Sequence, residues 1–342
     1  MPETTPHNAP TLDDVARQAN VSTATVSRCL NRSGKVSEKT RERVMSAVEA
    51  LGYTPNFGAR ALAAKRTLTI GAVIPTMANS IFARGLQAFQ ETLNEHGYTL
   101  LVSSTGYDPR KEAEQIRTLL ARGADGLLLI GYDRDAATYD FLQARNVPFL
   151  LSWAYRSDEP HPAIGFDNCQ SMMELTKLVL EMGHTDVAII SGIRDGNDRA
   201  VDRVKGIHMG LAQAGVNPQT APLIEVDYTI EDGAAAFADL MQGRKRPTAV
   251  LCINDVLAAG AIQRAQQMGI RVPDDVSITG FDDIEIASLV TPKLTTVHVP
   301  HAHMGSLAAT ALVDMIENKT TVKPVALDSA IQMRGSLGPI AP

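Results

Sequence analysis

TLDDVARQANVSTATVSRCLNRSGKVSEKTRERV, residues 11–44, contains the start and stop signals of three short helices. Thr11 stands three residues before Asp14 in a capping-box pattern, and apolar residues follow at helical spacing. Residues 20–22 interrupt this pattern, and a second helix is predicted over residues 23–30. Ser37 is placed to cap a third helix, which Gly52 ends. Two helices joined by so short a turn predict a helix-turn-helix.

In a helix-turn-helix the second helix enters the major groove of DNA. Thr23 and Ala24 are short enough to let its backbone approach the bases, and Arg28 lies one turn further on, where it can bond a guanine. A small helical bundle with a polar face is the alternative interpretation. Phosphate contacts are predicted for nearby side chains with hydroxyl or amide groups, namely Ser22, Thr25, Ser27, Asn31 and Ser37.

The sequence of residues 55–66 predicts a helix of at most two turns. A helix this short is only marginally stable alone in water. DNA can stabilise such a segment, since Arg60, Lys65 and Arg66 attract phosphates and Leu62 is an apolar side chain able to wedge between base pairs. A plain interdomain linker is the other interpretation. We expect residues 1–10 to be a disordered tail, 11–54 the DNA-binding domain and 55–66 a hinge.

The net charge of −6 over 342 residues hides a division of charge. Residues 1–66 hold ten Lys and Arg against six Asp and Glu, a balance of +4, whereas the remaining 22 basic and 32 acidic residues leave −10. The basic head suits a nucleic-acid partner. No apolar run is long enough to span a bilayer, the first ten residues lack a secretory pattern, and the cysteines are few and scattered, so we expect a cytoplasmic protein without membrane contact.

Residues 67–342 alternate apolar strand-like runs with helical patterns, which is typical of α/β folds with parallel sheets. There are too many strands for one compact half, so we predict two similar lobes, lobe 1 from about 67–166 and 300–326 and lobe 2 from about 167–299 and 327–342. Strands are predicted over residues 69–74, 99–102, 126–130, 148–151, 187–191, 224–226, 249–252 and 277–281, and helices over 81–95, 112–122, 172–182, 201–214, 256–268 and 305–317.

Ligands of such sheets bind beyond the carboxyl ends of the strands, here in the cleft between the lobes. The polar and aromatic residues at those ends suit a polyhydroxylated or mixed polar ligand. Arg199 and Arg203 share one helix face near its N-terminus, which favours an anion, so a sugar acid is predicted ahead of a neutral sugar and a purine. Alternatively, Arg199 forms a surface ion pair with Asp195, Asp198 or Asp202. The predicted ligand-binding residues are Thr76, Phe82, Trp153, Asn197, Arg199, Arg203, Tyr228, Asn254, Asp255 and Asp282.

Catalytic and metal sites are poorly supported. Asp282 and Asp283 are adjacent and point apart in a strand or turn, and His298, His301 and His303 have no clear carboxylate or thiolate partner. No nucleophile-elbow or P-loop motif is present. We therefore predict no catalytic residue, no metal and no cofactor.

The quoted stretch, followed by LGYTPNFGARAL and TLTIGAVIP, resembles the LacI/GalR family of bacterial transcription regulators. The resemblance runs through nearly the whole chain and implies a helix-turn-helix head on a two-lobed body like that of periplasmic binding proteins. It implies that Thr23, Ala24 and Arg28 read bases and that Leu62 is inserted at the operator centre. The set of DNA-binding positions that it implies also includes Thr11, Tyr53, Asn56, Ala59 and Arg60.

For the body, the resemblance places Arg203, Asn254, Asp255 and Asp282 at effector-contacting positions, in RVKG, CIND and TGFDD. Asn197 and Arg199 are not fixed by the family and are predicted to determine ligand choice. This sequence departs from the family's pattern at Gly58, a position where family members commonly have a branched residue. The resemblance also implies a homodimer on a near-palindromic operator, and SLGPIAP at the C-terminus has no heptad series that would support a tetramer. The function implied is a ligand-responsive repressor. A solute-binding receptor and a cytoplasmic enzyme are the rival interpretations.

Overall fold

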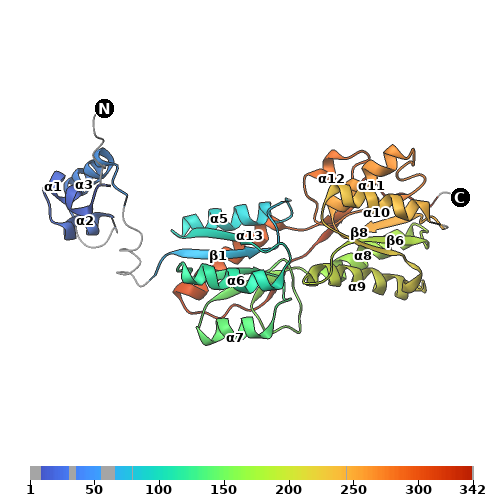
Figure 1. Cartoon of the computed structure of the whole chain (residues 1–342), viewed down its shortest axis with the longest axis horizontal. Coiled ribbons are helices and arrows are strands. Elements are labelled where there is room, and N and C mark those ends of the chain that lie inside the picture. The colour runs from blue at the N-terminus through green and yellow to red at the C-terminus, as the bar shows by residue number, and fades with distance from the viewer. Residues whose placement is uncertain (1–8, 31–35, 55–65, 79, 244, 341–342) are drawn as a thin grey trace, which may run out of the picture. The chain divides into compact units, whose positions relative to one another are not determined.

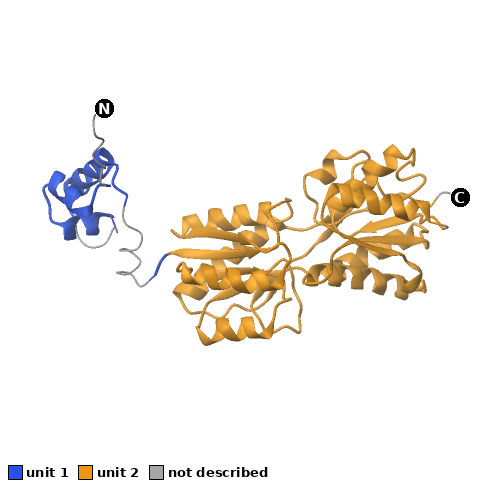
Figure 2. Ribbon diagram, in the orientation of Figure 1, with its two compact units in different colours: residues 1–67 blue, residues 68–342 orange. Residues whose placement is uncertain are grey.

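The computed structural model describes residues 9–30, 36–54, 66–78, 80–243 and 245–340. The chain divides into two compact units, residues 1–67 and 68–342, which are coloured separately in Figure 2. The first unit is the head and the second is the body. None of the helices in the described ranges combines the length and apolarity that a bilayer span requires.

The head contains the helices α1 (Leu12–Gln18), α2 (Thr23–Leu30) and α3 (Glu38–Leu51). The N-caps of α1 and α3 lie where the sequence predicts them. Thr11 and Asp14 form the reciprocal capping box at the start of α1, with Thr11 N donating to Asp14 Oδ2 over 2.9 Å. Ser37 accepts from the backbone of the first turn of α3, and Gly52 ends that helix in the left-handed conformation. The predicted helix-turn-helix is confirmed.

A small apolar core holds the three helices together. Val15 from α1, Ala19 directly after it, Val26 and Cys29 from α2, and Val44 from α3 are all buried in it. These residues recur at helical spacing, so each helix keeps one face for the core and exposes the opposite face. Arg41 Nη1 donates to the Cys29 carbonyl over 3.3 Å and ties α3 to the end of α2.

Lobe 1 of the body is built on a six-stranded sheet with the strand order β11-β5-β4-β3-β1-β2. Its paired strands all run parallel, and β1 and β3 are buried throughout because helices cover both faces. In Figure 1, α5 and α13 lie on one face of this sheet and α6 and α7 on the other. The elements are β1 (Thr69–Ile74), α5 (Ala83–Glu95), β2 (Thr99–Ser104), α6 (Pro109–Ala121), β3 (Gly126–Ile130), α7 (Ala136–Ala144), β4 (Phe149–Ser152), β5 (Ala163–Gly165), α13 (His301–Glu317) and β11 (Val325–Ala326).

Lobe 2 repeats this architecture with a four-stranded parallel sheet in the order β7-β6-β8-β9. Helices α8 and α9 pack together on one side of it and α10 and α11 on the other (Figure 1). The elements are α8 (Asn168–Glu181), β6 (Val187–Gly192), α9 (Asp198–Gln213), a 3-10 turn (Pro218–Thr220), β7 (Leu223–Val226), α10 (Ile230–Gln242), β8 (Ala249–Cys252), α11 (Asp255–Gln267), β9 (Ser277–Thr279), α12 (Ile286–Leu289), β10 (Thr296–His298) and β12 (Ala330–Gln332).

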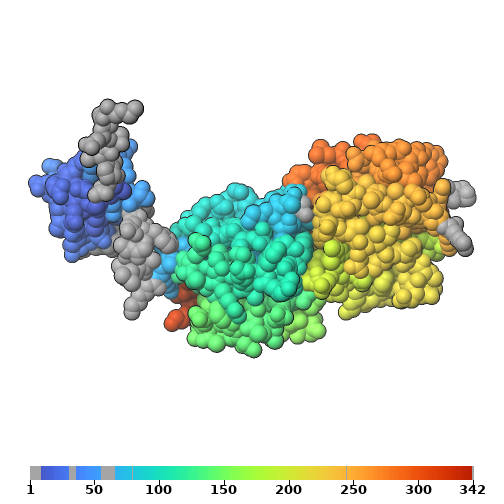
Figure 3. Space-filling model, in the orientation of Figure 1, coloured from blue at the N-terminus to red at the C-terminus, as the bar shows by residue number. Residues whose placement is uncertain are grey.

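The chain passes between the lobes after β5, before α13 and after β11. The last passage lets β12 pair antiparallel with β10, so that Thr296 lies opposite Gln332. Lobe 1 and lobe 2 abut along the boundary seen in Figure 3. The predicted α/β body with parallel sheets is therefore confirmed, and the antiparallel pair is an addition to it.

Candidate functional site

The exposed face of α2 is the candidate DNA-reading surface of the head. Val26 and Cys29 are buried, whereas Ala24 and Arg28 are exposed and Thr23 is half-buried on the other side of the helix. No hydrogen bond or ion pair ties Arg28 to the part of the chain that the structure describes. Its side chain is exposed, whereas Val26 and Cys29 of the same helix are buried in the head core.

The predicted phosphate-binding hydroxyls also have partners inside the head. Ser22 Oγ accepts from Thr25 N over 3.2 Å, and the hydroxyls of these two residues lie 3.0 Å apart. Ser37 caps α3 and lies 2.8 Å from the hydroxyl of Thr40. Each of these hydroxyls therefore stabilises a helix start.

Of the remaining predicted DNA-binding residues, the structure describes some and leaves the others outside its described ranges. Thr11 is an exposed helix cap, Ser27 is half-buried on α2, and Tyr53 packs its half-buried ring on the head core. Asn31, Asn56, Ala59, Arg60 and Leu62 lie outside the described residues, as does the predicted hinge except for its last residue.

A cavity between the two lobes collects eight of the ten predicted ligand-binding residues. It encloses about 320 Å³ of empty space, part of it open to solvent. Ile81, Tyr107 and Ala200 complete its wall. The predicted residues that line it are Phe82, Trp153, Asn197, Arg199, Arg203, Tyr228, Asn254 and Asp282.

Arg203 and Asp282 form a buried, two-fold hydrogen-bonded ion pair in this wall. Arg203 Nη2 donates to Asp282 Oδ1 over 3.0 Å, and Nη1 donates to Oδ2 over 3.3 Å. The same guanidinium donates to the Ile253 carbonyl and to Asn168, and it stacks 3.7 Å from the centre of the Phe281 ring. Its charge is therefore neutralised by the protein before any ligand binds.

Arg199 also forms an ion pair. Its partner is Asp198, one of the three carboxylates considered in the sequence analysis. Arg199 Nη1 lies 2.7 Å from Asp198 Oδ1, and both side chains are buried, so the pair is internal rather than on the surface. Helix α9 begins at Asp198, earlier than predicted, because Asn197 accepts a capping hydrogen bond from Ala200 N. That early start places Asp198 and Arg199 in the first turn, at the cleft.

Aromatic faces and unpaired donors make up the rest of the wall. The rings of Phe82 and Trp153 meet edge to face with centroids 5.4 Å apart, and Tyr228 accepts a hydrogen bond of 2.9 Å from Asn197 Nδ2. Trp153 Nε1 and Asn254 Nδ2 are buried and have no hydrogen-bond partner among the described residues. Unpaired buried donors are costly, so each is a position where a ligand oxygen would stabilise the complex.

Two predicted ligand-binding residues lie elsewhere. Thr76 does not line the cavity, and its hydroxyl accepts from Ala78 N over 3.0 Å. Asp255 is fully buried and also absent from the wall; it accepts from Ile284 N over 2.8 Å and from the Thr296 hydroxyl over 2.5 Å. Burial raises the pKa of the Asp255 carboxyl well above its ordinary value. These contacts hold the loop after β9 and the start of β10 to α11.

Tyr107 is a cavity residue that sequence reasoning missed. It follows β2 with a φ of 63°, in the left-handed region, and its ring stacks on Tyr228 of the other lobe with centroids 5.4 Å apart. Burial raises the pKa of the Tyr107 hydroxyl, which therefore stays protonated as a donor. The only signal in the sequence was its place just beyond a predicted strand.

Comparison with known proteins agrees with both parts of the molecule. Residues 11–56 match the model of bacterial regulatory proteins of the lacI family, and residues 176–337 match a periplasmic binding protein-like domain. The HTH-type transcriptional regulator DegA of Bacillus subtilis (strain 168) is 35% identical over 300 residues, covering 86% of this chain and 88% of DegA.

Two solved structures share the architecture of the whole chain. One is the lac repressor dimer bound to operator and the anti-inducer ONPF, with a TM-score of 0.85, 28% identity and coverage of 97% of this chain and 100% of that chain. The other is the complex of the transcriptional regulator CelR with cellobiose, with a TM-score of 0.70, 30% identity and coverage of 96% and 99%. The chain belongs to the LacI family of bacterial regulatory proteins, which are DNA-binding transcription regulators.

Proposed function

We propose that the protein is a homodimeric repressor that reads a near-palindromic operator through α2 and responds to a carbohydrate bound between its lobes. The observation that carries the DNA-binding part is the exposed pair Ala24 and Arg28 on a helix whose opposite face, Val26 and Cys29, is buried in the head core. A dimer would present two such helices to successive major grooves. The lac repressor structure, a dimer on operator DNA, supports this arrangement.

Charge in the cleft supports a neutral carbohydrate over a sugar acid. The spacing of Arg199 and Arg203 predicts an anion, but each guanidinium is already paired with a buried carboxylate, Asp198 and Asp282 respectively. An anionic ligand would find no uncompensated cation in this wall and would have to lose its hydration. Aromatic faces and unpaired N–H donors suit the apolar faces and hydroxyl oxygens of a sugar. The CelR complex, with its bound cellobiose, supports the same class.

Selection of duplexes from a random DNA library by the full chain tests the operator proposal. We expect enrichment of one near-palindromic sequence with two half-sites. Enrichment of a single half-site would contradict the dimer, and binding without sequence preference would contradict base reading by α2.

Calorimetric titration of the full chain with glucose, galactose, gluconate and hypoxanthine tests the ligand class. We expect heat from a neutral sugar and no binding of gluconate or hypoxanthine. Binding confined to gluconate would restore the sugar acid, and binding confined to hypoxanthine would replace the carbohydrate by a purine.

A further inference from the structure

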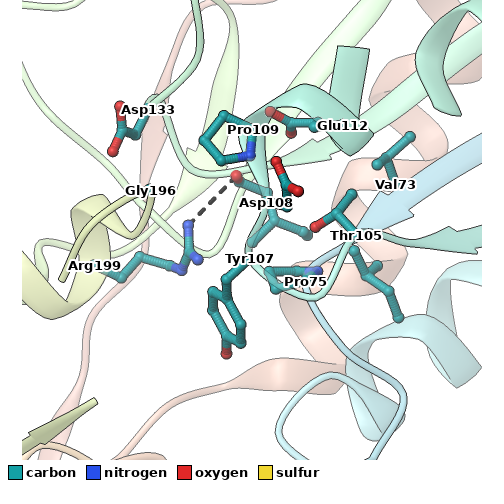
Figure 4. Close-up of a pocket in the computed structure, with 12 residues that line it drawn as sticks. Val73, Pro75, Thr105, Tyr107, Asp108, Pro109, Glu112, Asp133, Gly196 and Arg199 are labelled. Carbon is teal, nitrogen blue, oxygen red and sulfur yellow. Dashed lines mark hydrogen bonds between the residues drawn. The ribbon is translucent and has the colours of Figure 1, made fainter. Parts of the chain in front are cut away.

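His301 joins the two lobes at a point where the chain crosses between them. It is the first residue of α13, in lobe 1, and its Nε2 lies 3.1 Å from the carbonyl oxygen of Asp282, which follows β9 in lobe 2. Arg199 of α9 also joins the lobes, since its Nη1 donates to the Ile130 carbonyl over 3.4 Å, the bond dashed in Figure 4. A guanidinium stays charged at physiological pH, whereas an imidazole titrates near neutrality. Of these two contacts, only that of His301 can therefore respond to pH.

The His301 imidazole is buried and hydrogen-bonded through one nitrogen only. The residue is 3% exposed, and its Nδ1 has no hydrogen-bond partner among the residues that the structure describes. A carbonyl oxygen only accepts hydrogen bonds, so Nε2 carries the proton and Nδ1 is left as an acceptor. The site therefore holds a neutral imidazole. A second proton, on Nδ1, would create a buried charge whose N–H has no acceptor.

Charged groups from three neighbouring elements face this ring, and each is already paired. The Asp282 carboxylate is held by Arg203 of α9 in a two-fold hydrogen bond. Glu285, next to α12, pairs with Arg84 of α5, and 2.6 Å separate Arg84 Nη2 from Glu285 Oε1. Burial lowers the pKa of His301, the two guanidiniums lower it further, and the Asp282 carboxylate opposes them. The carboxylates near the ring are thus engaged before it can take a second proton.

The lobe 1 side of the ring is tightly packed. A Cβ on Gly85 of α5 would lie 2.5 Å from Trp153 Cζ2 and 3.2 Å from the His301 carbonyl oxygen. A Cβ on Gly305 of α13 would lie 2.0 Å from the Gly85 carbonyl oxygen, so α5 and α13 are in direct backbone contact. The centroids of the Trp153 and His301 rings are 6.4 Å apart. A charged ring would therefore gain water most directly by separation of the Asp282 segment of lobe 2.

We propose that His301 is a pH-sensitive latch between the lobes: the neutral imidazole holds the Asp282 carbonyl, and protonation of Nδ1 releases it and separates the lobes at the cleft. A histidine exposed to water has a pKa of about 6.5, so the separated arrangement binds the proton more tightly than the joined one. The equilibrium constant for separation therefore rises up to about tenfold between about pH 7.5 and about pH 5.5. This inference goes beyond the proposed carbohydrate response, because the latch acts in the chain without a ligand.

Trp153 provides a direct test of the latch. It is the only tryptophan in the sequence, it is 1% exposed, and it lines the cavity between the lobes. Acrylamide quenching of its fluorescence measures the access of solvent to the indole ring. In the full chain without ligand, we expect the quenching constant to rise about twofold or more from about pH 7.5 to about pH 5.5, while circular dichroism shows a folded chain. An unaltered quenching constant over this range would overturn the inference, whichever variants fold.

Histidine variants assign the pH response to its residue. In His301→Gln, an amide that does not titrate can still donate to the Asp282 carbonyl, so we expect low quenching throughout the pH range. His303→Gln is the matched control, because His303 is exposed on the same helix, and it should retain the full response. A response that survives in folded His301→Gln, or that is also lost in His303→Gln, would overturn the assignment. Loss of the response in His298→Gln, which removes the imidazole bonded to Asp283, would overturn it as well.

Discussion

The carboxylate of Asp198, in the first turn of α9, accepts a hydrogen bond of 2.6 Å from the backbone N–H of Tyr132, which follows β3 in the other lobe. Asp198 simultaneously pairs with Arg199, so one buried carboxylate joins a lobe 1 backbone to a lobe 2 helix. Gly131 makes this approach possible: a Cβ there would lie 2.2 Å from Arg199 Nη1. This contact joins the two lobes beside the cleft.

Replacing Asp198 by alanine should destabilise the body and weaken ligand binding. The change leaves the Tyr132 N–H without its acceptor and Arg199 without its counter-charge, which typically costs about 3 kcal/mol or more for buried groups. Urea unfolding of the full chain measures the loss. Asp195→Ala is the control on an exposed carboxylate nearby and should change the free energy of unfolding by less than about 0.5 kcal/mol. Equal effects of the two variants would argue against the contact.

Gly131→Ala should oppose closure of the cleft and lower ligand affinity more than tenfold. The new Cβ collides with Arg199 and Asp198, and the residue has a φ of 70° that disfavours alanine. Gly97→Ala separates these causes, because Gly97 has a φ of 78° but nothing lies within 4 Å of its Cβ position. Titration of both variants should show a loss of binding in Gly131→Ala alone. A loss shared by Gly97→Ala would point to backbone strain in general.

Asp255→Asn should stabilise the body increasingly as the pH rises. Burial raises the pKa of Asp255 in the folded state, so the folded chain binds this proton more tightly than the unfolded chain. The free energy of unfolding of the native protein therefore falls as the pH rises through the pKa of Asp255, whereas asparagine does not titrate. Free energies of unfolding for both proteins, measured from about pH 4 to about pH 8, should diverge toward high pH. A constant difference would mean that Asp255 does not titrate in this range.

Arg28→Ala should relax base preference at one position in each half-site. A bidentate contact to guanine is worth about 1–3 kcal/mol of discrimination, and Arg28 is exposed on the face of α2 that leaves the core. Affinities for the selected operator and for its single-base variants measure this. Arg43→Ala removes the same charge from an exposed position on α3 and should leave the preference unaltered. A uniform loss across all sequences in Arg28→Ala would demote the residue to a phosphate contact.

The sequence predicts two kinds of element best: strands buried on both faces and helices with one buried face. The apolar runs at β1, β3 and β8 coincide with the strands, because a parallel strand covered on both faces is apolar along its whole length. The core face of α2 follows from the spacing of Val26 and Cys29. Both patterns depend only on residues close together in the sequence, so they can be recognised without knowledge of the tertiary structure.

The cleft could be predicted only in part. Eight residues beyond strand ends meet in one cavity because parallel strands bring their carboxyl ends together. Tyr107 escaped prediction because its approach to Tyr228 depends on a left-handed turn and on the packing of one lobe against the other. The role of Asp198 was likewise hidden: its neighbour Arg199 is evident in the sequence, but the Tyr132 N–H is a backbone group in a distant segment.

The affinity of the full chain for its selected operator, measured with and without saturating sugar, tests most directly whether the cleft controls the head. The titrations above identify the sugar to use. The account predicts at least a tenfold change in the dissociation constant of the operator, and by reciprocity an equal change in sugar affinity when operator is bound. An operator affinity that stays the same at saturating sugar would contradict it.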